Sequence, residues 1–312
     1  MDALSRFLAL SRMGISLDVQ CRLSGPYVVP HEALAHGEAP FHLVLSGACQ
    51  LRTAQGVVHL EPGDFVLLPH GDAHDVLSPR SARKGHHGLA RVRAMRRESA
   101  LPLKGNVTRA DSAELDLLCG RFLCDPAASL ILLRALPSLM QVNLLEVAEG
   151  NTLRSLIDLL RHEAAHALPG ASEIVNAVGQ AVLTLALREF GKAESSEAHL
   201  LTLLSDERLA ASVDAMLQDP SQDWTVESLG ERAAMSRATY ARQFQNRAGM
   251  PVGDFLLRVR MMRACELLRR SRRGLADIGQ SVGYQSEAAF GKAFQRILGE
   301  TPGRWRRAQR AQ

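Results

Sequence analysis

The C-terminal third of this 312-residue chain contains one sequence pattern twice. The stretch SRATYARQFQNRAGMP, residues 236–251, aligns with SEAAFGKAFQRILGETP, residues 286–302, with one extra residue before the second proline. The aligned pairs include Tyr240 with Phe290, Arg242 with Lys292, Phe244 with Phe294 and Gly249 with Gly299. An internal repeat restricts this region to two modules of similar structure.

Each copy predicts a helix, a tight turn and a second helix. Thr225 is suited to cap the helix before the first copy, and Ser236 to cap the next one. In the second copy the pattern breaks at Gly283 and restarts at Ser286. On the second helix of each unit the aromatic residues share one stripe and face a core, and small or basic residues lie opposite. Such a face is suited to the major groove of DNA.

The segment between the copies, residues 252–271, predicts one long helix. About nineteen helical residues span about 28 Å at 1.5 Å per residue. This length is close to the roughly 34 Å that separates successive major-groove faces of B-DNA. The two units are therefore predicted to reach adjacent grooves on one side of a duplex.

The repeated region is basic, whereas the rest of the chain is acidic. From Ser221 onward there are 17 basic and 8 acidic residues, a net charge of +9, and residues 1–220 carry 20 basic and 25 acidic residues, a net charge of −5. A basic domain joined to an acidic one is typical of a nucleic-acid reader attached to a sensor. A solvated basic face without a polyanion partner would give the same count.

Residues from about Asp206 to Arg307 resemble the DNA-binding domain of the AraC/XylS family of bacterial transcription regulators. The resemblance rests on both repeated units, on the linking segment RMMRACELL and on the closing TPGRWR. It implies two helix-turn-helix units that bind double-stranded promoter or operator DNA. It also implies contact with RNA polymerase if the protein is an activator.

The same resemblance assigns the DNA-contacting positions. The family's base-reading positions fall on Ala238, Ala241 and Arg242 in the first unit and on Glu287, Ala288, Gly291 and Lys292 in the second. Because alanine and glycine have no polar side chain, Arg242, Glu287 and Lys292 are the expected sequence readers. The expected phosphate contacts are Arg237, Arg304, Arg306 and Arg307.

The acidic half contains β-rich runs from Phe41 to Leu77, separated by glycine-containing turns. Within it, Gly63, Pro69, Gly71 and His74 have the spacing of the second motif of the cupin family. The first cupin motif is incomplete, because no glutamate follows His42 at the expected distance. The region resembles a cupin, which implies an antiparallel β-barrel that senses a ligand.

Histidines are frequent in this half, and imidazole clusters bind transition metals. His31, His42 and His74 are predicted to converge inside the barrel and to hold a divalent metal, the one cofactor that the sequence suggests. The alternative is that each is an ordinary histidine of the barrel rim. Sensor domains of this type often bind small molecules without metal.

The stretch HEAAH, His162 to His166, has the spacing of a zinc metalloprotease helix. A helical projection puts both histidines opposite the apolar stripe, on the solvent side, and the helix stops at Pro169 soon afterwards. We therefore expect no hydrolase. The apolar helix predicted over residues 171–190 either packs on the preceding helix, residues 152–168, or joins two chains in a homodimer, which we favour.

Five scattered cysteines argue for free thiols rather than a secreted disulfide framework. Cys119 and Cys124 lie in a strand-like run with side chains on opposite faces, so a bridge between them is not expected. Cys49 and Cys265 are predicted to be buried and inert. Cys21 has polar sequence neighbours, and the adjacent Arg22 would favour its thiolate.

The opening MDALSRFL, Cys21, Pro30-His31, Phe41-His42 and LLCGRF around Cys119 resemble the reactive-chlorine-sensing subgroup of the AraC family. In that subgroup two cysteines respond to hypochlorous acid, and the resemblance implies Cys21 and Cys119 as the redox pair. The alternative is that both are ordinary thiols.

These patterns predict an α+β protein with three parts. Residues 1–190 form a cupin-like sensor and dimerisation domain, residues 191–204 a linker, and residues 205–312 an all-α DNA-binding domain. The chain lacks a run of the roughly 18 apolar residues that cross a membrane and lacks a cleavable leader, so we expect a cytoplasmic protein without a membrane partner. The expected function is transcription regulation, with activation by oxidant through the cysteines. The alternatives are a small-molecule or metal effector in the barrel, and a cupin-type metalloenzyme with a DNA-binding tail; we expect no enzyme.

Overall fold

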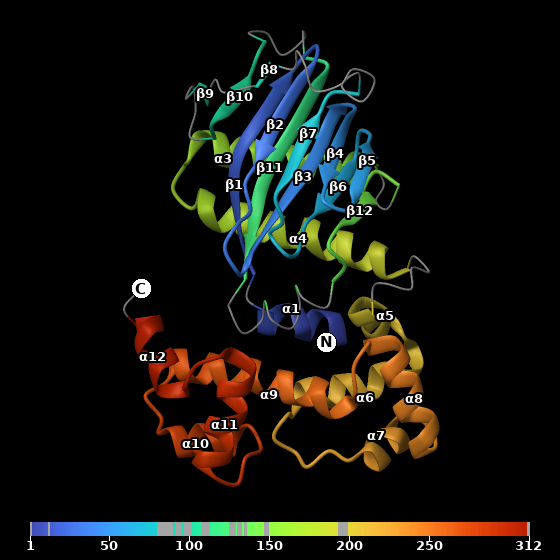
Figure 1. Cartoon of the computed structure of the whole chain (residues 1–312), viewed down its shortest axis with the longest axis vertical. Helices are drawn as coiled ribbons and strands as arrows, with labels where there is room; N and C mark the ends of the chain where they lie inside the picture. Colours follow the sequence, from blue (N-terminus) through green and yellow to red (C-terminus); the bar gives the residue numbers. More distant parts are fainter. Residues whose placement is uncertain are drawn as a thin grey trace. The chain divides into compact units, whose positions relative to one another are not determined.

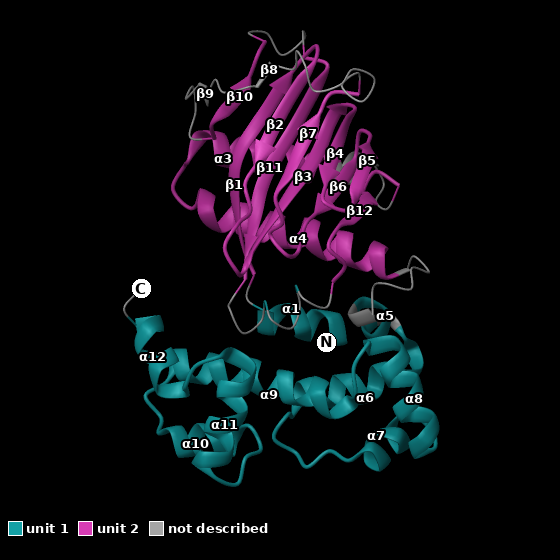
Figure 2. Cartoon of the chain, in the orientation of Figure 1, with its two compact units in different colours: residues 1–12, 125–135, 194–312 teal, residues 13–124, 136–193 magenta. Residues whose placement is uncertain are grey.

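The computed structural model of the chain describes residues 2–11, 13–79, 90–91, 95–96, 101–107, 113–124, 129, 133, 136–146, 150–192 and 199–310. Its contacts divide the chain into two compact units (Figure 2). Unit 1 comprises residues 1–12, 125–135 and 194–312, and unit 2 comprises residues 13–124 and 136–193. The residues between 193 and 198, in the middle of the expected linker, lie outside the described part.

Unit 2 is built on two β-sheets (Figure 1). The seven-stranded sheet has the order β12 (Met140–Asn143), β6 (Asp64–Leu67), β3 (Glu38–Gly47), β11 (Leu115–Leu123), β1 (Gly14–Leu23), β10 (Leu103–Gly105) and β9 (Met95–Arg96). The five-stranded sheet has the order β5 (Gly56–Leu60), β4 (Cys49–Thr53), β7 (His74–Leu77), β2 (Tyr27–His31) and β8 (Ala90–Arg91).

The predicted fold class, a cupin-like β domain followed by a helical domain, is confirmed. Most neighbouring strands are antiparallel, as expected. Two pairings are parallel, β1 with β10 and β2 with β8. Parallel partners need long connections between strands, so the local patterns in the sequence did not predict them.

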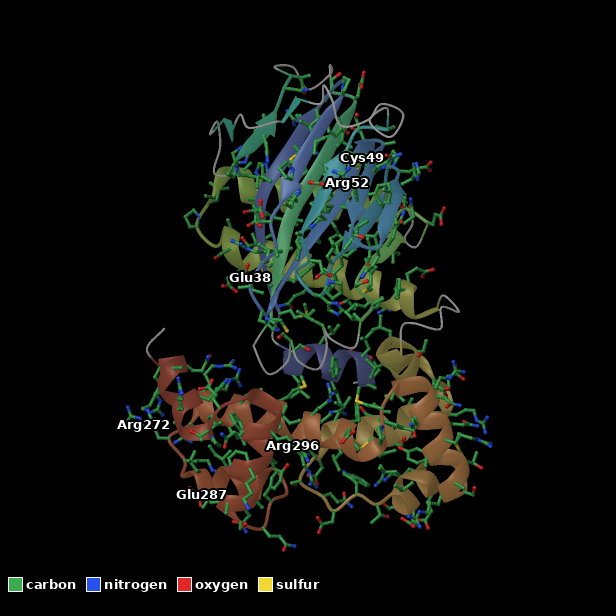
Figure 3. All side chains as sticks on the ribbon, viewed as in Figure 1. Glu38, Cys49, Arg52, Arg272, Glu287 and Arg296 are labelled. Carbon is green, nitrogen blue, oxygen red and sulfur yellow. The ribbon has the colours of Figure 1, made fainter. Side chains whose placement is uncertain are left out.

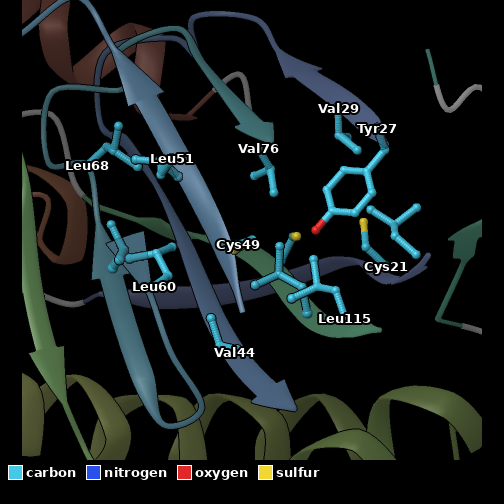
Figure 4. Close-up of a cluster of buried hydrophobic side chains, with 14 residues drawn as sticks. Cys21, Tyr27, Val29, Val44, Cys49, Leu51, Leu60, Leu68, Val76 and Leu115 are labelled. Carbon is cyan, nitrogen blue, oxygen red and sulfur yellow. The ribbon is translucent and has the colours of Figure 1, made fainter. Parts of the chain in front are cut away.

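The inner faces of both sheets form one apolar core (Figure 4). The fully buried side chains include Tyr27, Val44, Leu51, Leu60 and Leu115, from strands of either sheet. Burial follows from the alternation of side chains along each strand, because every second residue points inward. Any polar or reactive group on these inner positions is consequently shielded from water.

The cupin-like motif is explained by its turns. Gly63 has φ of 90° and Gly71 has φ of 72°, both in the left-handed region that glycine adopts without steric strain. Gly71 begins the approach to β7, whose first residue is His74. The glycine spacing thus fixes where His74 enters the sheet.

Two helices cover strands of the larger sheet. Helix α3 (Gly150–His166) packs against α4 (Ala171–Lys192), and α4 contacts β1 and β12. Gly179 lets α4 approach β1 closely, because a Cβ there would lie 2.5 Å from the Ile15 side chain. These helices end and begin within two residues of the predicted limits.

Unit 1 is helical. Its C-terminal elements are α5 (His199–Ser205), α6 (Glu207–Gln218), α7 (Val226–Arg232), α8 (Arg237–Ala248), α9 (Val252–Arg270), α10 (Leu275–Ser281), α11 (Glu287–Leu298) and α12 (Pro302–Arg310). The predicted N-caps Thr225 and Ser236 are confirmed, since each side chain accepts a backbone N–H of the helix that follows. Ser286, where the second copy restarts, caps α11 in the same way. Gly249 and Gly299 end α8 and α11 in the left-handed conformation.

The repeated aromatic residues form the cores of the two helix-turn-helix units. Tyr240 and Phe244 on α8 are fully buried, and Phe244 meets Phe255 of α9 edge to face. Phe290 and Phe294 on α11 are equally buried, and Phe294 meets Trp305 of α12. The predicted stripes therefore face the interior, which turns the opposite faces of α8 and α11 outward.

Helix α1 (Ala3–Ser11) belongs to unit 1, although it precedes the first strand of unit 2. It contacts α5, α6 and α9, with Phe7 fully buried. The Arg6 guanidinium pairs with Asp214 of α6 at 2.6 Å. The expected domain limits of 1–190, 191–204 and 205–312 remain a prediction.

Across the described residues, no helix has both the length and the apolar character required to span a bilayer.

Candidate nucleic-acid interface and a buried histidine–thiol cluster

The outward face of α8 carries the positions expected to contact DNA in the first unit. Arg237, Ala238 and Arg242 are exposed, and Ala241 is half-buried. The Arg237 guanidinium lies 3.0 Å from a carboxylate oxygen of Glu227 on α7, with both side chains more than half exposed. Such a surface ion pair is weak and leaves the guanidinium accessible to a phosphate.

The outward face of α11 carries the corresponding positions in the second unit. Glu287, Ala288 and Lys292 are exposed, and Glu287 and Arg296 extend from this helix in Figure 3. Gly291 is half-buried, and a Cβ placed there would have no atom within 4 Å. The face is therefore open along its length.

The arginines of α12 that were expected to contact phosphates differ in exposure. Arg304 and Arg307 of α12 are exposed. Arg306 is half-buried, its guanidinium donates to the Arg273 carbonyl at 2.8 Å, and burial lowers its pKa. Arg306 thus holds α12 in place, a role that the charge pattern alone did not reveal.

Arg260 of α9 joins elements of both helix-turn-helix units. Its Nε donates to the Pro220 carbonyl at 2.8 Å and its Nη2 to the Gln222 carbonyl at 3.0 Å, both in the loop before α7. The same guanidinium lies 5.9 Å from the ring centre of Tyr284, just before α11. Sequence analysis did not single out this residue, because its partners are distant in the chain.

The three histidines expected to converge do lie together inside unit 2. His31 ends β2, His74 begins β7 directly opposite it, and His42 lies on β3 of the other sheet. One ring nitrogen from each lies within 4.8 Å of the other two. The rings of His31 and His74 are stacked at 4.7 Å, and His42 meets both edge to face.

Burial keeps these imidazoles neutral. It lowers the pKa of His31 to about 3 and lowers the pKa of His42 well below its ordinary value. The pKa of His74 is also lowered, mainly by burial. A neutral imidazole has a free lone pair on one nitrogen, which is the form that binds a metal ion.

Hydrogen bonds hold each ring from the side away from the cluster. His31 Nδ1 lies 3.2 Å from the Val29 carbonyl, and His74 Nδ1 lies 2.8 Å from the Asp72 carbonyl. His42 differs, because its Nδ1 lies 3.1 Å from Cys119 Sγ. Its Nε2 lies 2.7 Å from His74 Nε2. Protein metal sites show this arrangement of outer partners on ligating histidines, so the residues fit a divalent metal.

Cys119 and Cys21 form a thiol pair next to the histidines. Cys119 is the cross-strand partner of His42, and Cys21 lies on the neighbouring strand β1. The two thiols share a hydrogen bond, which lowers the pKa of Cys21 despite its burial. The same bond, with burial, raises the pKa of Cys119.

The prediction that Cys21 lies in polar surroundings is wrong. Its side chain is 1% exposed and lies in the core, beside Tyr27 in Figure 4. The Arg22 side chain lies on the opposite face of the strand, where it pairs with Asp116 at 3.4 Å. The nearby cation is instead Lys104, the parallel-strand partner of Cys21 on β10, whose charge also lowers the pKa of Cys21.

The other three cysteines are buried, as predicted for Cys49 and Cys265. Burial raises the pKa of Cys124 to about 12, and Cys265 is enclosed in α9. Cys49 was expected to be inert, and burial raises its pKa to about 12. It nevertheless lies in the same core cluster as Cys21 and Cys119. Its position near the other two thiols could not be predicted from the sequence, because β4 belongs to the other sheet.

The HEAAH stretch is not a metal site among the described residues. His162 and His166 are exposed on α3, as the helical projection predicted, and their rings contact each other at 4.2 Å. Glu163 between them is buried. The described residues bring no further histidine, cysteine or carboxylate to this pair.

Comparisons with known proteins match both units. A family model described as Cupin matches residues 2–190, and a model described as Helix-turn-helix domain matches residues 229–308. An uncharacterized HTH-type transcriptional regulator of Haemophilus influenzae is 30% identical over 99% of this chain and 99% of its own length. The RCS-specific HTH-type transcriptional activator RclR of Escherichia coli K12 is 31% identical over 98% of this chain and 97% of its own.

Among solved structures, the DNA-binding domain of AdpA, in complex with a target DNA, is similar to part of the chain. It is 33% identical, covers 34% of this chain and 96% of its own length, and has a TM-score of 0.32.

Proposed function

This chain belongs to the AraC family of transcriptional regulators and has a cupin-type N-terminal domain; on that basis we propose that oxidation of Cys21 and Cys119 switches how it binds its operator. The observation that carries the proposal is that Cys21 and Cys119 lie on adjacent strands inside the same buried cluster of unit 2, close enough for each thiol to shift the pKa of the other. The relative from Escherichia coli is named an RCS-specific activator, which supports an oxidant as the signal and activation as the outcome.

The strand register supports a conformational consequence. Cys119 is paired with Val19 and Cys21 with Leu117, so the two cysteines are diagonal neighbours. Diagonal positions of an antiparallel pair are about 7–8 Å apart, whereas a disulfide usually joins Cα atoms about 4.4–6.8 Å apart. Closing the bond therefore shifts β1 against β11. The irregular pairing between Leu17 and Val19 gives β1 a place to absorb the shift.

The chain itself connects this strand to the DNA-binding unit. Strand β1 starts at Gly14, and only residues 12 and 13 separate it from α1. Helix α1 contacts α6 and α9, the latter being the helix between the two helix-turn-helix units. A displacement of β1 would move α1 through this short connection. The movement would change the populations of two states of the helix-turn-helix units that differ in operator affinity.

We assign DNA recognition to side chains on the outward faces of α8 and α11 and on α12. We assign base contacts to Arg242, Glu287 and Lys292, and phosphate contacts to Arg237, Arg304 and Arg307. Ala238, Ala241, Ala288 and Gly291 let the backbone of α8 and α11 approach the bases closely. Activation would follow from contact with RNA polymerase on the promoter.

A homodimer is the assembly that the surface of unit 2 supports. Large apolar side chains are exposed on and beside α3 and α4: Leu159 at 41%, Leu168 at 51% and Ile174 at 36%. Helix α4 also packs on α3, the other outcome that the sequence allowed. Exposed apolar side chains that gather in one region mark association surfaces, and these three lie on α3, on α4 and in the turn between them.

A metal effector is a second candidate, favoured by the convergence of His31, His42 and His74. Three neutral imidazoles can bind a divalent ion and leave one coordination position open. The third candidate from the sequence, a metalloenzyme with a DNA-binding tail, would use that open position. The full-length relatives, which are named as transcriptional regulators, favour a sensor.

The deciding experiment is a gel shift with DNA from upstream of the gene. Reduced protein, protein treated with stoichiometric hypochlorous acid, and the variants Cys21→Ser and Cys119→Ser are compared, with Cys265→Ser as the matched control in α9. We expect the oxidant to change affinity or footprint in the wild type and the control only. Specific binding that ignores the oxidant would refute the thiol switch and leave the regulator in need of another effector.

A further inference from the structure

His42 is held differently from the other two histidines of the cluster. His31 and His74 are fixed by backbone carbonyls, which are permanent hydrogen-bond acceptors. The third ring is fixed by Cys119 Sγ at 3.1 Å. A thiol can donate or accept, and it can be oxidised. The hydrogen-bond partner of one of the three histidines can therefore be altered by oxidation.

The hydrogen atoms along this chain of contacts can be counted. A carbonyl only accepts, so His74 Nδ1 carries a proton and donates to Asp72, and its neutral ring leaves Nε2 as an acceptor. His42 Nε2 lies 2.7 Å from that acceptor and so donates to it. His42 Nδ1 is then the acceptor for the Cys119 S–H.

Metal ligation requires the opposite arrangement. His42 Nε2 points into the cluster, so it must present its lone pair there and leave the proton on Nδ1. The Nδ1–H then donates to Cys119 Sγ, and the S–H turns to its other neighbour, Cys21. The direction of the His42–Cys119 hydrogen bond thus reverses between the two forms.

We propose that Cys119 is the outer partner of a three-histidine divalent-metal site, so that oxidation of the Cys21–Cys119 pair weakens metal binding and metal binding protects the thiols. The inference rests on the proposed thiol switch and on the proposed metal site, and it joins them. Cys119 is a positioning residue, because it acts through His42.

The oxidative step balances with a hypohalous acid as oxidant. The two thiols lose two protons and two electrons and form one S–S bond. Hypochlorous acid accepts the two electrons and leaves as chloride and water. The sulfur of Cys119, now bonded to Cys21 and drawn toward β1, no longer serves the His42 Nδ1–H as an acceptor.

Loss of an outer partner typically lowers metal affinity by about 10- to 100-fold. Linkage makes the effect reciprocal, so saturating metal favours the dithiol over the disulfide by the same factor. For a two-electron couple this corresponds to a reduction potential about 30–60 mV higher.

The test is a zinc titration of the full-length chain against a chromophoric chelator. Reduced wild type is expected to bind one Zn²⁺, and oxidised wild type and Cys119→Val to bind it about 10- to 100-fold more weakly. Cys119→Ser keeps an acceptor oxygen, so it should retain most of the affinity and ignore the oxidant. Cys49→Val, which alters a neighbouring buried thiol without touching His42, is the matched control.

Oxidised wild type needs no substitution, so the test stands even where Cys119→Val fails to fold. Equal zinc affinity in the reduced and oxidised wild type would overturn the coupling, as would the absence of zinc binding to the reduced protein. Neither result affects the gel shift, which tests the thiol switch by operator binding alone.

Discussion

At the scale of single residues, Arg242 is the sharpest test of DNA reading. It is exposed on the outward face of α8. Arg242→Ala should weaken operator binding by about 1–3 kcal/mol if the guanidinium contacts a base, as measured by fluorescence anisotropy. Arg247→Ala is the control, because Arg247 on the same helix pairs with Asp206 at 3.2 Å. An equal loss on scrambled DNA would reduce Arg242 to a phosphate contact.

Tyr240 gives the DNA-binding unit a pH dependence. Its hydroxyl donates to Ser212 Oγ at 3.0 Å, and burial raises the pKa of Tyr240 to about 12. An unfolded tyrosine ionises near pH 10. The contribution of the neutral Tyr240 hydroxyl to the free energy of unfolding is therefore complete below pH 10 and is lost as the pH rises toward 12.

Tyr240→Phe should cost about 1 kcal/mol of unfolding free energy at pH 8 through the lost hydrogen bond. Urea titrations at a series of pH values should then show the gap from the wild type narrowing above pH 10. A gap that stays constant to pH 12 would mean that the hydroxyl ionises as readily in the fold as outside it.

The residue scale also shows what the sequence reveals about a site. The three histidines were identifiable because a glycine and proline spacing marked His74 and because imidazole clusters are common metal sites. The partners of their Nδ1 atoms were not, since ring orientation depends on packing. Cys21 was misread, because sequence neighbours on a strand point to opposite faces and its real neighbour, Lys104, comes from a parallel strand.

At the scale of elements, α9 and its Arg260 set the relation between the two helix-turn-helix units. Arg260→Met removes both carbonyl contacts and the contact with Tyr284. The two units should then bind a full operator about tenfold more weakly, because their effective concentration on the second half-site falls. Binding to a half-site that engages α8 alone should change little.

Arg263→Met is the matched control, since Arg263 pairs with Glu266 on α9 itself. Titrations on full and half operators measure both affinities. A loss of the same size on both operators would show that Arg260 supports the fold of the first unit rather than the spacing of the two.

Element prediction succeeded where the signal was local. The caps at Thr225, Ser236 and Ser286 and the length of α9 follow from short-range patterns. The parallel pairing of β1 with β10 escaped, because nothing near Cys21 in sequence indicates a partner about eighty residues away. Strand order depends on which apolar faces meet, and many strands share the same local pattern.

At the scale of the whole molecule, the association surface on unit 2 is testable. Leu159→Glu places a charge among the exposed apolar residues of α3 and α4 and should shift the protein from dimer to monomer in sedimentation velocity. Val57→Glu is the control, because Val57 is 47% exposed on β5, in another part of the unit. A wild type that sediments as a monomer would refute the proposed dimer, and a Leu159→Glu variant that remains dimeric would refute this surface as its contact.

The order of the two parts along the chain could be predicted from the sequence, but the unit to which each helix belongs could not. The change from β-rich to helical patterns and from acidic to basic composition indicated two different parts. The membership of α1 was not predictable, because its period-four stripe of Ala3, Phe7 and Ser11 fits any apolar surface. Only the assembled contacts show that it packs on α6 and α9.

The position of α1 bears on how the chain is made. The ribosome releases α1 before the strands of unit 2, and α6 follows about 200 residues after α1 and α9 about 240, which at about 5–20 residues per second means a wait of roughly 10–50 s. During that interval Phe7 lacks the partners that bury it in the finished protein, while the strands of unit 2 emerge and pair. The contacts of α1 with α6 and α9 therefore form only after the strands of unit 2 have been synthesised.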